Sequence, residues 1–173
     1  MAAGRTRTPI ATGQTAPPFS LGSTDGKTRS LKEALVQGPV LVAFFKVSCP
    51  TCQYTFPFIE RMYQQLRSAG AKDLQVWGIV QDDAKHGQDF ARELGITFPI
   101  LTDEEPYEIS REYGLNFVPT IFLIAPEGLV EIASDGFTRV DLVAIHKSFA
   151  ARYSVNPPAL FQPSDKVPEF KPG

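Results

Sequence analysis

The sequence predicts an α/β fold with a mixed central sheet and helices on both faces. In the first half, apolar segments alternate with segments of helical periodicity, the order typical of parallel strands joined by helices. The last two predicted strands, residues 120–124 and 129–133, are joined only by the turn at 126–128, which indicates an antiparallel hairpin. A chain of 173 residues with 43% hydrophobic side chains can bury one sizeable core, so we expect a single domain.

The segment before the cysteines predicts a hairpin, a helix and a strand. Asp25-Gly26 is a hairpin-turn signal and indicates an N-terminal hairpin extension. Ser30 followed by Glu33 resembles a capping box, so we expect a short helix that starts there and ends at Gly38-Pro39. Residues 40–45 are apolar without alternation, as expected for a strand buried on both faces of a sheet.

The remaining elements follow from periodicity, apolar runs and glycine stops. Phe56, Ile59 and Leu66 recur at helical spacing, so we expect a helix from the cysteines to Gly70. The further predicted elements are strands at 74–80 and 98–101, helices at 89–94 and 104–113, and a last helix marked by Leu142, Ile145 and Phe149.

Composition divides the chain into three predicted regions. Residues 1–15 are polar and are expected to form a flexible N-terminal arm. Residues 16–151 contain the predicted strands and helices and form the folded domain. Residues 152–173 are a proline-rich tail that cannot sustain a helix, so we expect it to be extended or mobile.

Charge and hydropathy exclude some classes of partner. The formal net charge of −2 gives no electrostatic reason to expect nucleic acid or an anionic membrane. The first residues lack the apolar segment of a secretory signal, and no later apolar run approaches a membrane span. We therefore expect a cytoplasmic protein, or a periplasmic one if a leader has been lost. We expect a monomer, with a weak dimer as the alternative.

The chemistry of the chain is predicted to centre on Cys49 and Cys52, its only cysteines. A strand that ends before Cys49 and a helix that begins there place this thiol at a helix N-terminus, where unpaired N–H groups and the helix dipole favour a thiolate. Pro50 suits the first helical position because it has no N–H to leave unpaired. Cys52 would lie one turn inside, so Cys49 is the expected nucleophile and Cys52 the resolving thiol. This redox-active pair would be the whole redox centre, with no other cofactor.

Three other roles compete with electron transfer at the cysteine pair. A zinc site needs more ligands than the two cysteines, His86 and His146 offer in any usual spacing, so no metal is expected. A structural disulfide across so short a loop would constrain the unfolded chain only weakly. Two unreactive core thiols are the third alternative, which the position at a strand-to-helix junction disfavours. Both histidines are expected on the surface.

Several segments resemble a known family. Residues 40–57, with both cysteines and Pro57, resemble the thioredoxin fold, as does Phe117-Val118-Pro119-Thr120-Ile121-Phe122-Leu123-Ile124. The resemblance covers residues 16–151. The segment 82–116 looks like the central insertion of TlpA-like and peroxiredoxin-like members, which minimal thioredoxins lack. The chain therefore resembles TlpA-like or AhpC/TSA-related redoxins.

The resemblance implies further site residues. In the family, the proline that matches Pro119 follows a cis peptide bond and faces the cysteines, and the backbone of Val118 would pair with an extended substrate. Pro50 and Thr51, between the cysteines, are further candidate substrate-binding residues. The Thr51 hydroxyl could donate a hydrogen bond, but we expect it to face water. Lys46, three residues before the first cysteine, is a candidate stabiliser of the thiolate through its charge, or it extends into solvent.

Several positions depart from the thioredoxin pattern. Pro50-Thr51 stand between the cysteines in place of the Gly-Pro of thioredoxins. Ser48 stands in place of the tryptophan that precedes the first cysteine in thioredoxins. Ala43 stands in place of the buried acid that assists proton transfer there. Proton handling at the cysteines is therefore expected to differ from that of thioredoxin.

The predicted function is that of a thiol-disulfide oxidoreductase, which exchanges disulfides with protein substrates and takes electrons from an upstream thiol donor. The first alternative is a peroxiredoxin-like thiol peroxidase with antioxidant activity. Peroxiredoxins carry Pro-x-x-x-Thr/Ser-x-x-Cys, but with Cys49 as the peroxidatic sulfur, Val42 and Lys46 stand where the proline and the hydroxyl belong. The second alternative is a redox-inactive binding module of the same fold.

Overall fold

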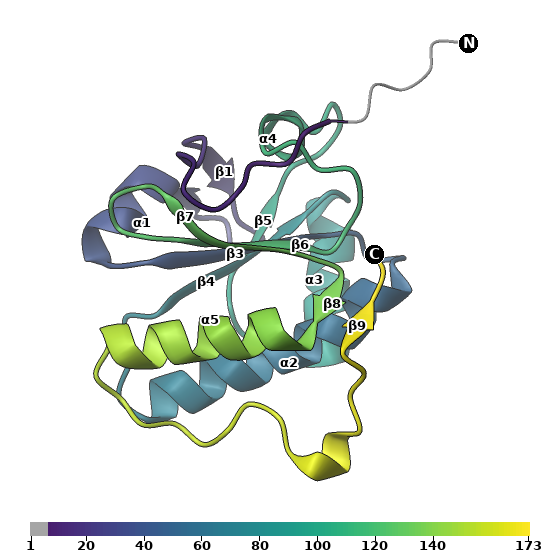
Figure 1. Cartoon of the computed structure of the whole chain (residues 1–173). Helices are drawn as coiled ribbons and strands as arrows, with labels where there is room; N and C mark the ends of the chain where they lie inside the picture. The colour runs from purple at the N-terminus through teal and green to yellow at the C-terminus, as the bar shows by residue number, and fades with distance from the viewer. Residues whose placement is uncertain (1–6) are drawn as a thin grey trace.

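The computed structural model describes residues 7–173 as a five-stranded mixed sheet with helices on both faces (Figure 1). The strands lie in the order β5-β4-β3-β6-β7. β3 is parallel to β4, and β4 to β5, whereas β6 is antiparallel to β3 and to β7. The predicted α/β class with a mixed central sheet is confirmed.

The elements follow the chain in the predicted alternation of strands and helices. The strands are β1 (Ser20–Gly22), β2 (Thr28–Ser30), β3 (Val40–Phe45), β4 (Gln75–Val80), β5 (Ile100–Thr102), β6 (Thr120–Ile124), β7 (Val130–Asp135), β8 (Phe137–Thr138) and β9 (Phe170–Lys171). The helices are α1 (Leu31–Gln37), α2 (Pro50–Ser68), α3 (Ala84–Leu94), α4 (Glu108–Glu112), α5 (Arg139–Arg152) and the 3₁₀ turn η1 (Pro163–Asp165). No helix within residues 7–173 is long and apolar enough to cross a membrane.

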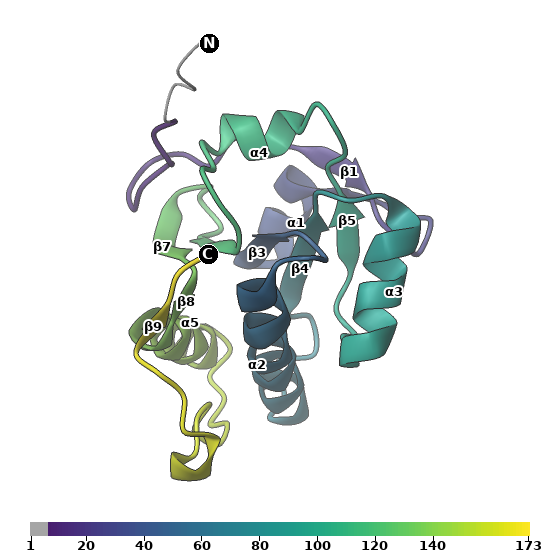
Figure 2. The same ribbon diagram turned by 90° about the vertical axis from the view of Figure 1, so that its right-hand side faces the viewer.

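Two apolar cores lie on opposite faces of the sheet. β3 contributes to both, because all of its residues are buried and successive side chains point to opposite faces. One core joins the sheet to α2, α3 and α5, and it contains Phe45, Phe56 and Phe90. The other core joins the sheet to α1, the β1–β2 hairpin and Tyr113. Figures 1 and 2 show α2 and α5 side by side on one face of the sheet, with α1 and α4 on the other.

Two helices differ in length from the prediction. α3 begins at Ala84 rather than at residue 89, because the Asp83 side chain accepts a hydrogen bond from the His86 N–H and caps the helix there. The helix expected over residues 104–113 is reduced to α4, Glu108–Glu112. Tyr107, just before it, has a left-handed backbone (φ 58°), so a regular helix cannot extend back through this residue.

Both ends of the described chain contact the domain. In the part of the predicted arm that is described, the Ile10 N–H donates to the Tyr113 carbonyl and the Gly13 N–H to the Val130 carbonyl. Residues 1–6 of that arm lie outside the described residues. The proline-rich tail leaves the end of α5, turns at η1 and returns to the end of the sheet from which α2 starts (Figures 1 and 2). The tail is extended over most of its length, and it lies against the domain.

Candidate active site around the two cysteines

The cysteine pair lies at the junction between β3 and α2. Cys49 is the N-cap residue of α2, with extended backbone angles (φ −80°, ψ 115°), and Pro50 occupies the first turn. The Cys49 sulfur accepts a hydrogen bond from the backbone N–H of Cys52 at 3.1 Å. Because this N–H is one of the unpaired donors of the helix N-terminus, it stabilises negative charge on the Cys49 sulfur.

The two thiols differ strongly in exposure. Cys49 is partly exposed, whereas Cys52 is 0% exposed, and both are free thiols. Burial is the main cause that raises the pKa of the Cys52 thiol, and its hydrogen bond with Cys49 raises that pKa further. Cys52 is therefore held neutral inside the protein, while Cys49 is the sulfur that an external molecule can reach.

The loop before β6 faces the exposed sulfur. The Val118–Pro119 peptide bond is cis, the form that the resemblance implies. The Cys49 thiol donates a hydrogen bond to the Val118 carbonyl oxygen at 3.5 Å. β6 pairs antiparallel with β3, so the start of β6 lies beside the end of β3. The loop before β6 is therefore close to the cysteines, although 69 residues separate Val118 from Cys49.

A cavity of about 450 Å³ opens at Cys49 and is walled in part by Lys46, Pro50, Tyr107 and Val118. The exposed Lys46 ammonium lies 5.7 Å from the centroid of the Tyr107 ring, within the range of a cation–π contact. Within residues 7–173, no hydrogen bond joins the Lys46 ammonium to either sulfur. The charge of Lys46 thus lies in the cavity wall, with the Tyr107 ring as its observed contact.

A buried polar chain in the cavity wall was not predicted from the sequence. Asp103 is 4% exposed and accepts hydrogen bonds from the Ser110 hydroxyl at 2.7 Å and from the Ser110 N–H at 2.8 Å. Gln81 donates to the same hydroxyl at 2.9 Å, and both Gln81 and Ser110 line the cavity. The only local sequence signal for this buried carboxylate is the position of Asp103 directly after a strand and before a helix.

The proline-rich tail also reaches the site, and nothing in its composition predicts this contact. The Thr51 hydroxyl donates a hydrogen bond to the Pro172 carbonyl at 2.6 Å, so the expectation that it faces water is wrong. Gly173 lines the cavity beside Cys49. The candidate substrate-binding residues Pro50, Thr51 and Val118 are therefore brought together, with the end of the tail among them.

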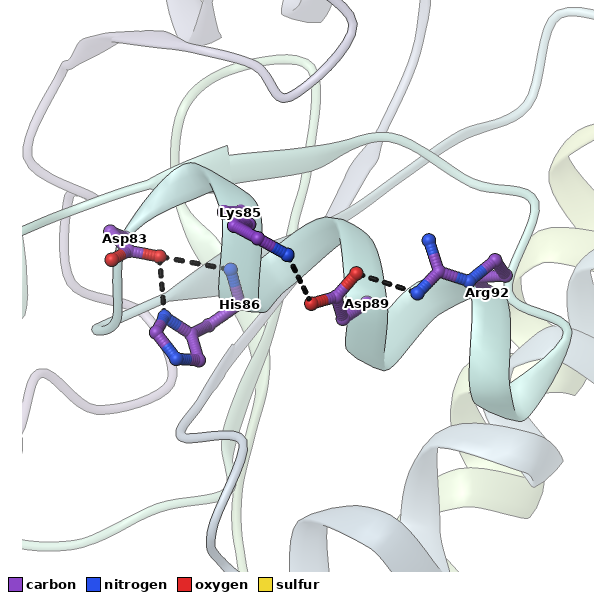
Figure 3. Close-up of polar contacts among 5 residues, drawn as sticks. All are labelled: Asp83, Lys85, His86, Asp89 and Arg92. Carbon is purple, nitrogen blue, oxygen red and sulfur yellow. Dashed lines mark hydrogen bonds and ion pairs between the residues drawn. The ribbon is translucent and has the colours of Figure 1, made fainter.

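The two histidines lie away from the cysteines and differ from each other. His86 is exposed and pairs with Asp83 at 2.6 Å at the start of α3 (Figure 3). The expectation of a surface position is wrong for His146, which is 6% exposed because its side of α5 packs inward. Burial lowers the pKa of His146. Within the described part of the chain, no three His, Cys, Asp or Glu side chains gather as a metal site would require.

Residues 12–133 match the AhpC/TSA family. The chain belongs to this family. The thiol-disulfide oxidoreductase ResA of Geobacillus thermodenitrificans is 30% identical over 137 residues, which cover 79% of this chain and 76% of that protein. Peroxiredoxin Q, chloroplastic, of Populus jackii is 34% identical over 104 residues, which cover 60% of this chain and 46% of that protein.

A solved structure shows the same fold. The crystal structure described as thiol:disulfide interchange protein DsbE from Chlorobium tepidum has a TM-score of 0.69 and 26% identity, and the match covers 82% of this chain and 97% of that chain. The predicted thioredoxin fold is confirmed. The protein is a thiol-disulfide oxidoreductase of the AhpC/TSA family, with two neighbouring free thiols where β3 meets α2.

Proposed function

We propose that Cys49 is the nucleophile and Cys52 the resolving thiol of an exchange reaction with disulfides of protein substrates. The observation that carries this proposal is the unequal burial of the two sulfurs, with Cys49 open to a cavity and Cys52 fully enclosed. In the reductive direction, the Cys49 thiolate attacks one sulfur of the substrate disulfide. The S–S bond of the substrate breaks, a mixed disulfide forms, and the other substrate sulfur leaves as a thiolate that takes a proton from water.

The second step completes the transfer of two electrons to the substrate. Cys52 loses its proton and attacks the Cys49 sulfur of the mixed disulfide, so the second substrate sulfur leaves as a thiol. The product in the protein is the Cys49–Cys52 disulfide, which an upstream dithiol donor reduces again. Because Cys52 lies beneath Cys49, it reaches the mixed disulfide from inside the protein without competing with the substrate for the cavity.

The groove that receives the substrate is proposed to lie between Val118 and the start of α2. The Val118 carbonyl lies 3.5 Å from the Cys49 sulfur, so an extended chain that pairs with this backbone would bring its own sulfur near the nucleophile. Pro50 and Thr51 form the opposite side of the groove. The charge of Lys46 is proposed to stabilise the Cys49 thiolate from the cavity wall.

The roles of the two cysteines are tested by trapping. Cys52→Ser should accumulate a mixed disulfide between Cys49 and a protein substrate, seen on a non-reducing gel and lost on reduction. Cys49→Ser is the matched control, since it keeps one thiol of the pair and should trap nothing. Trapping by Cys49→Ser but not by Cys52→Ser would reverse the assignment, and normal turnover in either variant would refute it.

The direction of electron flow and the compartment are tested by the reduction potential of the cysteine pair in glutathione or dithiothreitol buffers. A value near −270 mV, about that of thioredoxin, supports a reductase suited to the cytoplasm. A value of about −120 to −180 mV supports an oxidant or isomerase role outside the reducing cytoplasm.

Peroxidase activity is the second candidate, favoured by the similarity to peroxiredoxin Q. It predicts that hydrogen peroxide oxidises the reduced protein rapidly and that Cys49→Ser abolishes this oxidation. Stopped-flow mixing with peroxide, compared with mixing with a protein disulfide, separates the two activities.

A further inference from the structure

The segment from Leu160 to Gly173, called the strap below, is fixed to the domain at a point far from the cysteines. The Leu160 side chain is 2% exposed, and the Phe161 ring lies 5.1 Å from the ring of Phe58 in α2. Arg61, one turn further along α2, holds both carboxylate oxygens of Asp165 at 2.8 and 3.0 Å. The start of the strap therefore has an apolar anchor and a bidentate ion pair of its own.

Beyond this anchor the strap runs toward the active site and forms a short two-stranded sheet with β8. β9, Phe170–Lys171, pairs antiparallel with β8, Phe137–Thr138. The Lys171 ammonium lies 4.7 Å from the centroid of the Tyr54 ring. Gly136, directly before β8, has a left-handed backbone (φ 65°), and a side chain there would overlap the carbonyl oxygen of Lys171. The glycine thus lets the strap approach the domain closely.

The last residues of the strap lie in the groove proposed for the substrate. The Pro172 carbonyl accepts a hydrogen bond from the hydroxyl of Thr51, which stands between the two cysteines in the sequence. Gly173 lies in the wall of the Cys49 cavity. A Cβ built on Gly173 would overlap the Val118 carbonyl oxygen and would lie 2.9 Å from the carbonyl carbon of Val118. The strap backbone is thus packed against the residue whose carbonyl faces the nucleophile.

We propose that the strap is an internal occupant of the substrate groove and that a protein substrate must displace its last residues to reach Cys49. The inference rests on the proposed function for the identity of the groove. The end of the strap makes two of the contacts proposed for an extended substrate, namely a hydrogen bond from Thr51 and backbone packing on Val118. The pairing of β9 with β8 holds the strap in this position. Because the anchor at Leu160 and Asp165 is separate, only the end of the strap has to move.

Occupation of the groove has a size-dependent consequence. A small reagent that approaches through the open side of the cavity can reach the partly exposed Cys49 while the strap is in place. A large reagent or a folded protein needs the space along Val118 and Thr51, which Pro172 and Gly173 fill. Loosening the strap should therefore accelerate large partners more than small ones.

The first test compares Gly173→Ala with Gly22→Ala. The new methyl group at position 173 would overlap the Val118 carbonyl, whereas at Gly22 nothing lies within 4 Å of the new methyl group. Reduced proteins are treated separately with iodoacetamide and with a poly(ethylene glycol) maleimide, and modification of Cys49 is followed by mass spectrometry. Gly173→Ala should raise the maleimide rate relative to the iodoacetamide rate by about 2- to 10-fold, as expected for loss of one hydrogen bond of the strap. Gly22→Ala should leave this ratio unchanged.

The second test loosens the anchor of the strap rather than its end. Asp165→Asn weakens the ion pair with Arg61. Asp89→Asn is the matched control, because Asp89 also pairs with an arginine, Arg92, but on the surface of α3 (Figure 3). Asp165→Asn should raise the same ratio of rates, and Asp89→Asn should not.

The results separate the strap from the proposed function. A ratio that is unchanged in both Gly173→Ala and Asp165→Asn would refute occlusion of the groove by the strap, even if the wild-type protein reduces protein disulfides. An increased ratio in a protein that exchanges no disulfide would support the strap and refute the proposed function. Faster reduction of a protein disulfide by Asp165→Asn, with unchanged reduction of a small disulfide, would support both.

Discussion

The contact between α2 and the sheet determines where the cysteines lie, and Phe56 is the residue through which it can be tested. Phe56 is fully buried one turn after Cys52. Its ring centroid lies 4.4 Å from that of Phe45 in β3, 5.4 Å from that of Phe90 and 6.0 Å from that of Phe98. The side chain thus joins the helix that carries the cysteines to the strand that precedes them.

We expect Phe56→Ala to lower the free energy of unfolding by about 3–5 kcal/mol. The value is that of a buried phenylalanine truncated to alanine, which loses its transfer free energy and leaves a cavity that rigid neighbours fill only in part. Of the three rings around Phe56, Phe45 lies in β3, Phe90 in α3 and Phe98 in the loop before β5, and all three are buried in the same core. We therefore expect the upper half of this range. For a domain of this size the melting temperature should fall by about 6–20 °C.

The assay is urea unfolding of the reduced protein, followed by circular dichroism and fitted by linear extrapolation. Val36→Ala is the control, since Val36 is 80% exposed on α1 and its truncation should change stability by at most about 0.5 kcal/mol. If Phe56→Ala and Val36→Ala lost the same stability, the aromatic cluster would not be what holds α2 against the sheet, and the argument for the position of Cys52 would fail with it.

Three further predictions follow from burial and packing. Iodoacetamide should label Cys49 in the folded, reduced protein, and it should label Cys52 only after unfolding in urea, as peptide mass spectrometry would show. Gly78→Ala should cost about 1–3 kcal/mol in urea unfolding, because the new Cβ would lie 2.7 Å from the Ile100 side chain. Because burial places the pKa of folded His146 below its unfolded value near 6.5, the unfolded chain binds the proton more readily as pH falls below that value. Stability should therefore fall between pH 7.5 and pH 5.0, and it should fall less in His146→Gln.

Each of these predictions has a result that would contradict it. Equal labelling of the two cysteines in the folded protein would show that Cys52 is accessible. A Gly78→Ala protein as stable as the wild type would show that the sheet has room beside Ile100. An identical pH dependence in wild type and His146→Gln would show that His146 keeps its ordinary pKa in the folded protein.

The sequence by itself determined the features that depend on neighbours in the chain. The apolar run at 40–45 predicted β3, and Pro50 after Cys49 predicted the start of α2, because buried strands and helix N-termini have local signatures. The assignment to the thioredoxin fold came from the resemblance of residues 40–57 and 117–124 to that family. The oxidoreductase class came from the same resemblance and from the spacing of the two cysteines. Where a local signal was missed, as with the Asp83 cap of α3, an element was found with a displaced start.

The tertiary structure alone decided which distant residues meet at the cysteines. The family resemblance had already placed Val118 at the cysteines. Gln81, Ser110 and the end of the strap lie in the wall of the same cavity because the sheet order β4-β3-β6 and the docking of the tail bring them there. No short-range pattern encodes these contacts, since they depend on how whole elements pack. His146 illustrates the same limit. Leu142, Ile145 and Phe149 identified the buried side of α5, but how far burial extends around the helix to His146 depends on the elements packed against it. The strap is the clearest case: its prolines predicted only that it would not be helical, whereas Leu160, Arg61 and Thr51 determine where it lies.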